Sequence, residues 1–220
     1  MKTLWIKLKG ILREVFFPQA DRCPLCGKEG GFCEDCRGQL RELLAGGDAA
    51  FYYGGIVREM IHRLKFRDQP HLAEVMGALM AEILPKDADL VTSVPLHRRR
   101  ILQRGYNQSR DMAREYARIL GLTYADTLLR VRNTPPQSLI KHRSQRQENI
   151  RGAFRAKSAL PLSGQRILLV DDVVTTGATI EECRRELLKA GAAEVTKISF
   201  AKGKDNGNSK DLAQEGIGEQ

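Results

Sequence analysis

The stretch from residue 166 to residue 179 constrains the fold of this chain more than any other, because a hydrophobic run, two acids and a glycine turn follow one another directly before a helical pattern. The residues from Ile167 to Val170 are all apolar, which is typical of a parallel strand buried on both faces. Apolar residues then recur at the spacing of one buried helical stripe, at Ile180, Cys183 and Leu187. The stretch therefore predicts a strand, a loop and a helix in direct succession.

The start of this helix carries two capping candidates. Thr179 is expected to cap it, and Glu182 stands at the capping-box position three residues later. Cys183 lies on the apolar stripe, so we expect it to be a core residue rather than a nucleophile.

The loop between strand and helix suits a phosphate group. Gly177 lets the backbone approach a ligand closely, and the helix N-terminus adds partial positive charge. Asp171 and Asp172 repel a phosphate, so we expect them to bind sugar hydroxyls, a magnesium ion or both. A phosphorylated ribose meets both requirements. A Walker loop and a dinucleotide fingerprint are excluded, because the glycine patterns of both are missing.

These residues resemble the phosphoribosyl pyrophosphate signature of type I phosphoribosyltransferases. The resemblance implies that the two acids bind the ribose hydroxyls and that the threonine-glycine loop takes the 5-phosphate. We expect magnesium to accompany this ligand, because carboxylates and substrate phosphates are both available to it. The implied site consists of Asp171, Asp172, Thr175, Thr176, Gly177, Ala178 and Thr179. The simpler alternative is a buried strand that ends in a polar turn.

Two Cys-x-x-Cys pairs, Cys23 with Cys26 and Cys33 with Cys36, lie six residues apart near the N-terminus. Four thiolates that converge in this way suit a tetrahedral structural zinc ion, and a segment this short and this poor in apolar residues needs the metal to fold. An iron-sulfur cluster remains an alternative, whereas disulfides are disfavoured in a chain with no export signal.

The first residues form an apolar pattern at helical spacing: Leu4, Leu8, Ile11, Leu12 and Val15. This pattern predicts a short amphipathic helix, which packs on its own protein or contacts a membrane surface or a partner. Charged residues interrupt the apolar run, so we expect neither a signal peptide nor a membrane span, and a cytoplasmic location.

The remaining pattern alternates strands and helices. Strands are expected at 51–53, 89–94, 167–170 and 194–201, and helices at 56–66, 71–84 and 107–120. Such alternation predicts an α/β fold with a parallel sheet, in which ligands bind beyond the carboxyl ends of the strands, where Asp171 and Pro95 lie. We therefore divide the chain into an amphipathic helix (1–19), a small four-cysteine, zinc-ribbon-like module (20–48), a phosphoribosyltransferase-like domain (49–201) and a disordered tail (202–220).

Positive charge gathers in one part of the chain. Residues 98 to 157 hold fifteen Lys and Arg against four Asp and Glu, a net charge of +11, whereas the whole chain carries only +9. The expected partner of this region is a polyanion, for which pyrophosphate and nucleic acid both qualify. A solvated basic face without a dedicated ligand is the alternative.

Two parts of the basic region resemble the ComF family of competence proteins: Ser93-Val-Pro-Leu-His97 and Arg104-Gly-Tyr-Asn-Gln108. The four-cysteine module fits that family too, as does the spaced set Arg132, Thr134, Gln137, Arg143, Asn149 and Phe154 at the position of the mobile loop of phosphoribosyltransferases. The resemblance runs from about residue 17 to residue 201. It implies a pyrophosphate or polyanion site that includes Ser93, Pro95, Arg98, Arg104, Arg132 and Arg143.

Two hypotheses for the function follow from this resemblance. The first is a competence and DNA-uptake factor that binds single-stranded DNA, retains a phosphoribosyl pyrophosphate site, and has other competence proteins, such as a DNA-translocating helicase, as partners. The second is an active phosphoribosyltransferase that makes a nucleotide from a base or an amine. No region of the chain is clearly a base-binding hood with an aromatic platform; residues 51 to 85 are a candidate, yet nothing in them identifies a base. Amide-donor chemistry is not supported, because Lys2 follows the first residue and no N-terminal nucleophilic cysteine is present.

Overall fold

The computed structural model describes residues 22–66, 69–135, 140, 142–157 and 161–203. The amphipathic helix expected at residues 1–19 and the expected tail from residue 204 onward lie outside these residues. Lys202, the first residue of the expected tail, instead belongs to the last strand. Among the described helices, none is long and apolar enough to cross a membrane.

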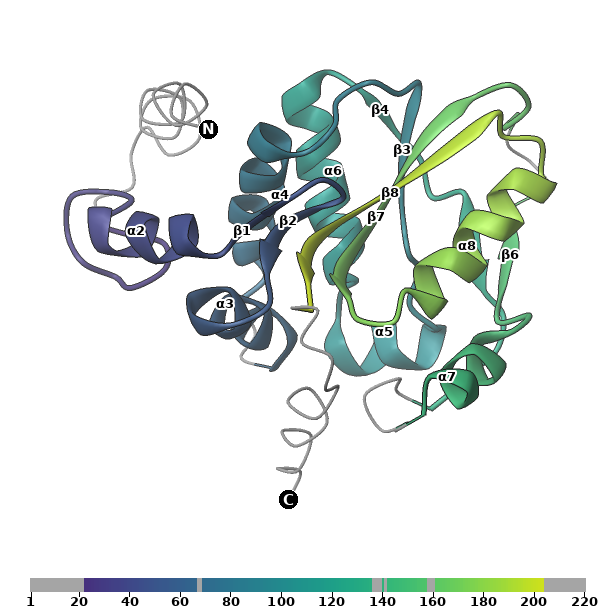
Figure 1. Cartoon of the computed structure of the whole chain (residues 1–220), viewed down its shortest axis with the longest axis horizontal. Helices are drawn as coiled ribbons and strands as arrows, with labels where there is room; N and C mark the ends of the chain where they lie inside the picture. Colours follow the sequence, from purple (N-terminus) through teal and green to yellow (C-terminus); the bar gives the residue numbers. More distant parts are fainter. Residues whose placement is uncertain (1–21, 67–68, 136–139, 141, 158–160, 204–220) are drawn as a thin grey trace.

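A six-stranded sheet forms the centre of the molecule, in the order β1-β2-β8-β7-β3-β4 (Figure 1). All neighbouring strands are parallel except β1 and β2, which are antiparallel. The strands are β1 (Leu44–Gly46), β2 (Ala49–Tyr52), β3 (Leu90–Ser93), β4 (Thr123–Tyr124), β7 (Arg166–Val174) and β8 (Glu194–Lys202). The predicted α/β class and its parallel sheet are confirmed.

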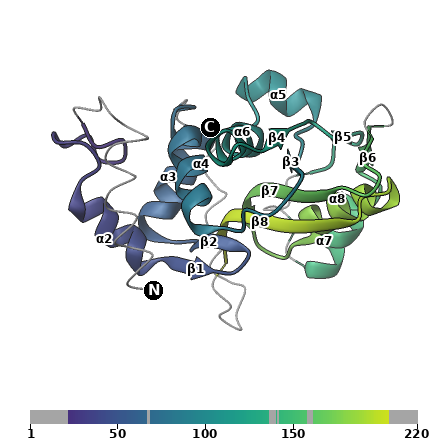
Figure 2. The ribbon, with the colours of Figure 1, turned by 90° about the horizontal axis from the view of Figure 1, so that it is seen from above.

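The described helices are α2 (Glu34–Glu42), α3 (Gly55–Phe66), α4 (Leu72–Ile83), α5 (Arg98–Arg104), α6 (Gln108–Leu120), α7 (Arg143–Ile150) and α8 (Ala178–Lys189). Helices α4 and α6 lie side by side (Figure 2). A separate antiparallel pair, β5 (Leu128–Arg130) and β6 (Phe154–Ala156), lies beside α8. Helix α5, the two short strands and α7 were not among the sequence-based expectations, because each is too short to show a clear period.

Burial along β7 explains why its predicted part is continuously apolar. Leu168 and Val170 join the core cluster of α3, α4 and α6, whereas Ile167 and Leu169 join the cluster that contains Cys183 of α8. Successive strand residues point to opposite faces, so both faces of the sheet are covered. The buried, structural position expected for Cys183 is confirmed.

The start of α8 differs from the prediction. Gly177 precedes the helix with a φ of 74°, and no side chain caps it, so the expected cap at Thr179 is wrong. The left-handed glycine closes the turn early, which places Thr179 inside the first helical turn. Glu182 does not complete a capping box; its carboxylate accepts hydrogen bonds from the Gly152 amide at 2.7 Å and from Arg185 at 2.6 Å.

The four-cysteine segment packs onto the sheet domain. Leu25, Phe32 and Leu40 are buried in the same cluster as the apolar residues of α3 and α4. The guanidinium of Arg63 on α3 donates a hydrogen bond to the Leu25 carbonyl oxygen at 2.5 Å. The segment and the larger unit therefore share one continuous core.

Candidate phosphoribosyl and polyanion site

Strand β7 runs through the two acids before it ends. Asp171 and Asp172 are buried, with 9% and 6% of their surface exposed. The N-terminus of α6 lies next to them: the Ser109 hydroxyl donates to Asp171 Oδ1 at 3.1 Å, and the Gln108 amide donates to Asp172 Oδ2 at 3.1 Å. The acids are thus held in fixed positions at the carboxyl end of the sheet, as the sequence predicts.

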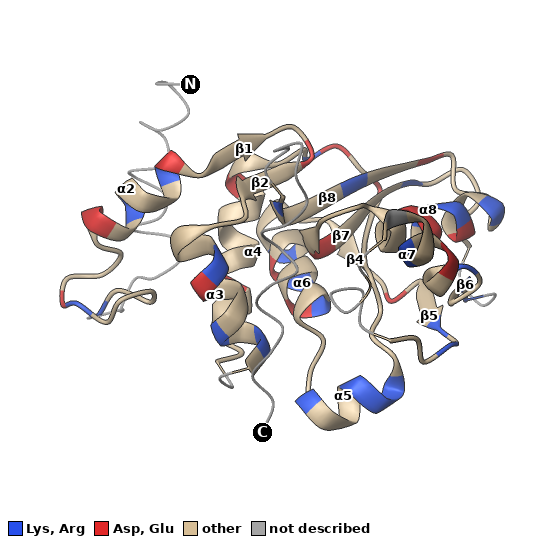
Figure 3. Ribbon diagram, turned by 60° about the horizontal axis from the view of Figure 1, so that its bottom comes forward, with Lys and Arg blue, Asp and Glu red and all other residues tan. Residues whose placement is uncertain are grey.

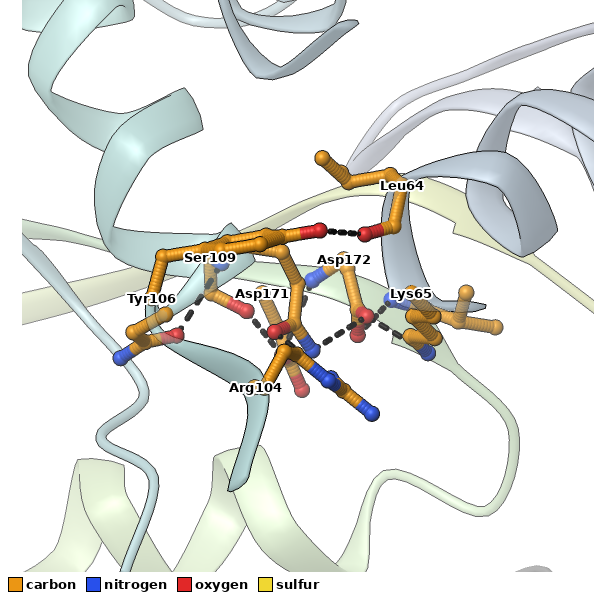
Figure 4. A network of polar contacts seen from close by, with 10 residues as sticks. Leu64, Lys65, Arg104, Tyr106, Ser109, Asp171 and Asp172 are labelled. Atoms are coloured by element: carbon orange, nitrogen blue, oxygen red, sulfur yellow. Dashed lines mark hydrogen bonds and ion pairs between the residues drawn. The ribbon is translucent and has the colours of Figure 1, made fainter. Parts of the chain in front are cut away.

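A lysine from another part of the chain neutralises one of the acids. Lys65, in the last turn of α3, places its Nζ 2.6 Å from Asp172 Oδ2 (Figure 4). The backbone amide of Val173 donates to the other carboxylate oxygen at 2.7 Å. Both carboxylate oxygens of Asp172 therefore have protein partners.

The two acids have opposite electrostatic environments. Burial, followed by the neighbouring Asp172 charge, raises the pKa of Asp171 above its usual range. Burial acts in the same direction on Asp172, but the Lys65 charge and hydrogen bond outweigh it and lower the pKa of Asp172. A further cation close to Asp171 would favour the ionised form of this acid, and a magnesium ion is one such cation.

The loop from Thr175 to Gly177 joins the acids to α8. Thr175 is exposed, and Thr176 and Thr179 are half-buried. Within the described residues, the hydroxyls of these threonines have no protein hydrogen-bond partner, so they are available as donors to a ligand at the helix N-terminus.

Two arginines converge on one threonine near this edge of the sheet. Arg130 of β5 donates to the Thr134 hydroxyl at 2.7 Å, and Arg100 of α5 donates to the Thr134 carbonyl oxygen at 3.3 Å. The Nε of Arg130 is buried without a hydrogen-bond partner, and in the described part of the chain neither arginine forms an ion pair with a carboxylate.

Electrostatics support an anion site at this pair. Burial and the Arg100 charge lower the pKa of Arg130 to about 10. Burial and the Arg104 charge lower the pKa of Arg100. The Asp171 charge acts in the opposite direction on Arg130 but is outweighed. Binding of an anion between the two partly buried cations would therefore be favourable.

The four cysteines of the N-terminal pairs come together in space. Their sulfur atoms lie within 4.8 Å of one another, and Cys26 Sγ is 3.5 Å from Cys33 Sγ. Sulfur ligands of a tetrahedral zinc ion are about 3.8 Å apart, as follows from a Zn–S bond of about 2.3 Å. All four thiols are free of disulfides, so the cluster fits a zinc ion.

The chain is similar to known proteins over most of its length. A family model for the phosphoribosyl transferase domain matches residues 107–215. The chain is 35% identical over 190 residues to the DNA utilization protein YhgH of Salmonella typhi, which covers 79% of this chain and 80% of that protein. It is 30% identical over 186 residues to the competence protein ComFC of Streptococcus pneumoniae, with 83% and 81% covered. The chain belongs to the ComF family.

Solved structures show a more distant likeness. The ComF-family chain has a TM-score of 0.46 and 23% identity to glutamine phosphoribosylpyrophosphate amidotransferase from B. subtilis, over 64% of this chain and 30% of that chain.

The residues that the sequence assigned to the polyanion site of this ComF-family chain have different partners in the structure. Ser93 is buried at the end of β3 and hydrogen-bonded to the Tyr124 hydroxyl at 3.0 Å, and Pro95 follows in the strand-end loop. Arg98 is exposed on α5, and Arg104 donates to Gln108 at 2.9 Å. Arg132 instead donates to the Arg151 carbonyl oxygen. The side chain of Arg143 lies outside the described residues.

Sequence reasoning missed Arg100 and Arg130 as members of the site, although both lie in the basic region. A signal for Arg130 exists: Leu128 and Arg130 alternate with the exposed Leu129, so a short strand would place Arg130 on the inner face. Lys65 gave no such signal, because its partner Asp172 is distant in the sequence.

Proposed function

We propose that this ComF-family chain serves DNA uptake or utilization by binding single-stranded DNA at the basic carboxyl edge of its sheet, and that it retains a phosphoribosyl pyrophosphate site there. The names of its relatives support the role in DNA metabolism. One observation carries the site: a buried acid pair, a threonine-glycine loop and an arginine pair without acid partners all belong to this edge.

Each part of phosphoribosyl pyrophosphate has a chemical counterpart in the site. The acids suit the ribose hydroxyls and a magnesium ion, the loop before α8 suits the 5-phosphate, and Arg100 with Arg130 suits the diphosphate. Lys65 must leave Asp172 before magnesium or a hydroxyl can take its place. Deoxyribose offers no 2-hydroxyl to the acid pair, so we assign this pair to the small ligand and the exposed basic residues to DNA.

The arginine pair gives a prediction for the diphosphate. The Arg130 guanidinium carbon lies 5.4 Å from the centroid of the Phe154 ring. Arg130→Met keeps an unbranched side chain over this ring but removes the positive charge. Loss of a charge-assisted hydrogen bond should weaken pyrophosphate binding about tenfold in calorimetry, or roughly 1.4 kcal/mol. Arg132→Met is the matched control, because Arg132 contacts the Arg151 carbonyl oxygen instead. Equal losses in the two variants would contradict the assignment.

Exposed arginines give a prediction for DNA. Arg98 and Arg99 begin α5 with exposed side chains, at an end of the molecule rich in Lys and Arg (Figure 3). If four to six phosphates are neutralised, the logarithm of the single-stranded DNA affinity should fall with the logarithm of salt at a slope of about −3 to −4. Arg98→Gln with Arg99→Gln should flatten that slope by about 1.4, since each phosphate contributes about 0.7.

The matched control removes the same charge elsewhere. Arg118 and Lys189 are exposed near the C-terminal ends of α6 and α8, where each forms an i,i+3 ion pair. Changing both to Gln should leave the salt slope unchanged. A shallow slope in the unmodified protein, or equal flattening by the control, would count against DNA binding at α5.

Turnover decides between the proposed function and an active phosphoribosyltransferase. The intact acid pair and the arginine pair favour the transferase as the second candidate, and the shared fold cannot separate the two. Release of pyrophosphate from phosphoribosyl pyrophosphate should be measured with a panel of bases and amines. Release with one acceptor would establish the transferase, whereas binding without release, together with salt-dependent DNA affinity, supports the DNA-handling role.

A further inference from the structure

Phe66 is an exposed aromatic residue in a chain whose other described phenylalanines are buried. It ends α3 with 65% of its surface exposed, whereas Phe51, Phe154 and Phe200 are at most 1% exposed. Burying a phenylalanine is normally favourable, so this ring would gain from contact with a partner.

Two side chains hold this ring in place. The His62 ring lies one helical turn earlier, with its centroid 5.0 Å from that of Phe66 and an interplanar angle of 44°. The Arg104 guanidinium carbon lies 5.7 Å from the ring centroid, within range of a cation–π interaction. The ring is thus positioned from α3 and from α5, while most of its surface stays open.

Phe66 lies beside the acid site rather than at a remote surface. Lys65, the preceding residue, contacts Asp172 at 2.6 Å (Figure 4). Arg104, which contacts the ring, also binds Gln108, and Gln108 in turn donates to Asp172. The ring is therefore connected to the acid pair through Arg104 and Gln108.

The surroundings of the ring are cationic and open. Arg104 is its charged neighbour on α5, and Arg98 and Arg99 are exposed at the start of the same helix. The Lys65 ammonium on α3 is paired with Asp172 and does not contribute. An aromatic ring next to arginines is the arrangement by which proteins bind single-stranded nucleic acid, with bases stacked on rings and phosphates near cations. An acidic partner would use only the arginines of this arrangement, and a purely apolar partner would use only the ring.

We propose that Phe66, flanked by His62 and held by Arg104, stacks an unpaired base of single-stranded DNA while the arginines of α5 contact the phosphates. This inference rests on the proposed DNA-binding function. It adds a contact with a base to the electrostatic contacts between arginines and phosphates. It also places an aromatic platform in the region from residue 51 to residue 85, where the sequence indicated none.

The test compares protein variants on two oligonucleotides of equal length and charge. One is oligo-dT and the other carries abasic sites in place of the bases. Phe66→Leu keeps an apolar side chain but removes the ring, so its affinity for oligo-dT should fall about tenfold, within the range of one base–aromatic stack, while the affinity for the abasic strand stays the same. Phe66→Trp should restore oligo-dT binding.

Leu102→Ala is the control for loss of apolar surface, because Leu102 is 84% exposed on α5 and carries no ring. It should bind both strands as the unmodified protein does. If Phe66→Leu binds oligo-dT as tightly as the unmodified protein does, or loses the same affinity for both strands, the stacking proposal is overturned.

Two further outcomes separate this proposal from the function on which it rests. If the unmodified protein binds no single-stranded DNA, the DNA-binding function fails and the stacking site fails with it. If DNA binds with a steep salt slope and Phe66→Leu changes nothing, only the stacking site fails. A free nucleobase whose binding depends on Phe66 when DNA binding does not would assign the ring to a transferase acceptor, which also overturns the proposal.

Discussion

Replacing Cys26 and Cys33 together by serine is expected to remove the bound metal and to unfold the segment around it. The unmodified protein should contain about one zinc ion per chain, since four sulfurs within 4.8 Å of one another suit a tetrahedral ion. Cys26 is exposed and Cys33 half-buried, so serine at these positions costs little packing and acts mainly through the metal. Structural zinc contributes roughly 10–16 kcal/mol in isolated zinc peptides, which makes this the largest effect we predict.

The structure also predicts that the damage spreads beyond the segment. Leu25 and Phe32 pack into the core that contains α3 and α4, so loss of the metal should lower the melting temperature of the whole protein. Elemental analysis and thermal unfolding measure the two effects. Cys183→Ser is the control, because it alters a buried core thiol and should destabilise the protein without changing its metal content. Iron in place of zinc, or full metal content in the double variant, would contradict the zinc assignment.

Changing Asp171 and Asp172 to asparagine should weaken binding of magnesium with phosphoribosyl pyrophosphate by at least about tenfold, or roughly 1.4 kcal/mol. Asparagine keeps the shape of each side chain but removes both negative charges, which magnesium and the ribose hydroxyls require. Calorimetry with the magnesium complex of the ligand measures this change. An unchanged affinity would place the ligand elsewhere.

Lys65→Met is a matched change that is expected to shift the magnesium-dependent affinity in the opposite direction. Lys65 occupies Asp172 Oδ2 at 2.6 Å, so removing its ammonium group frees the carboxylate for magnesium. We expect the magnesium-dependent affinity to rise in this variant and to fall in the asparagine variant. A loss of affinity in both would indicate that Lys65 itself contacts the ligand.

Local patterns in the sequence determined several parts of this protein. The run from Ile167 to Val170, the two acids and Gly177 are consecutive or nearly so, and the backbone alone brings them to the end of one strand. The same holds for the cysteine pairs, where short spacing limits how far the sulfurs can separate. The longer helices showed a clear period, so their positions were also predictable.

Local preference was less informative where two conformations compete. Threonine is a favourable N-cap residue, so Thr179 was a reasonable prediction. The helix α8 instead begins earlier, with Gly177 in the left-handed conformation at the N-cap position. The short helix α5 buries no residue, so no apolar period marks it in the sequence.

Only the tertiary structure decided how distant segments meet at the site. Lys65 reaches Asp172 because α3 ends beside the carboxyl end of β7, and Arg100 meets Arg130 because α5 and β5 converge on Thr134. The exposure of Phe66 likewise depends on what packs around the end of α3. Such contacts join residues far apart in the chain, and their geometry follows from the packing of whole elements rather than from any local preference.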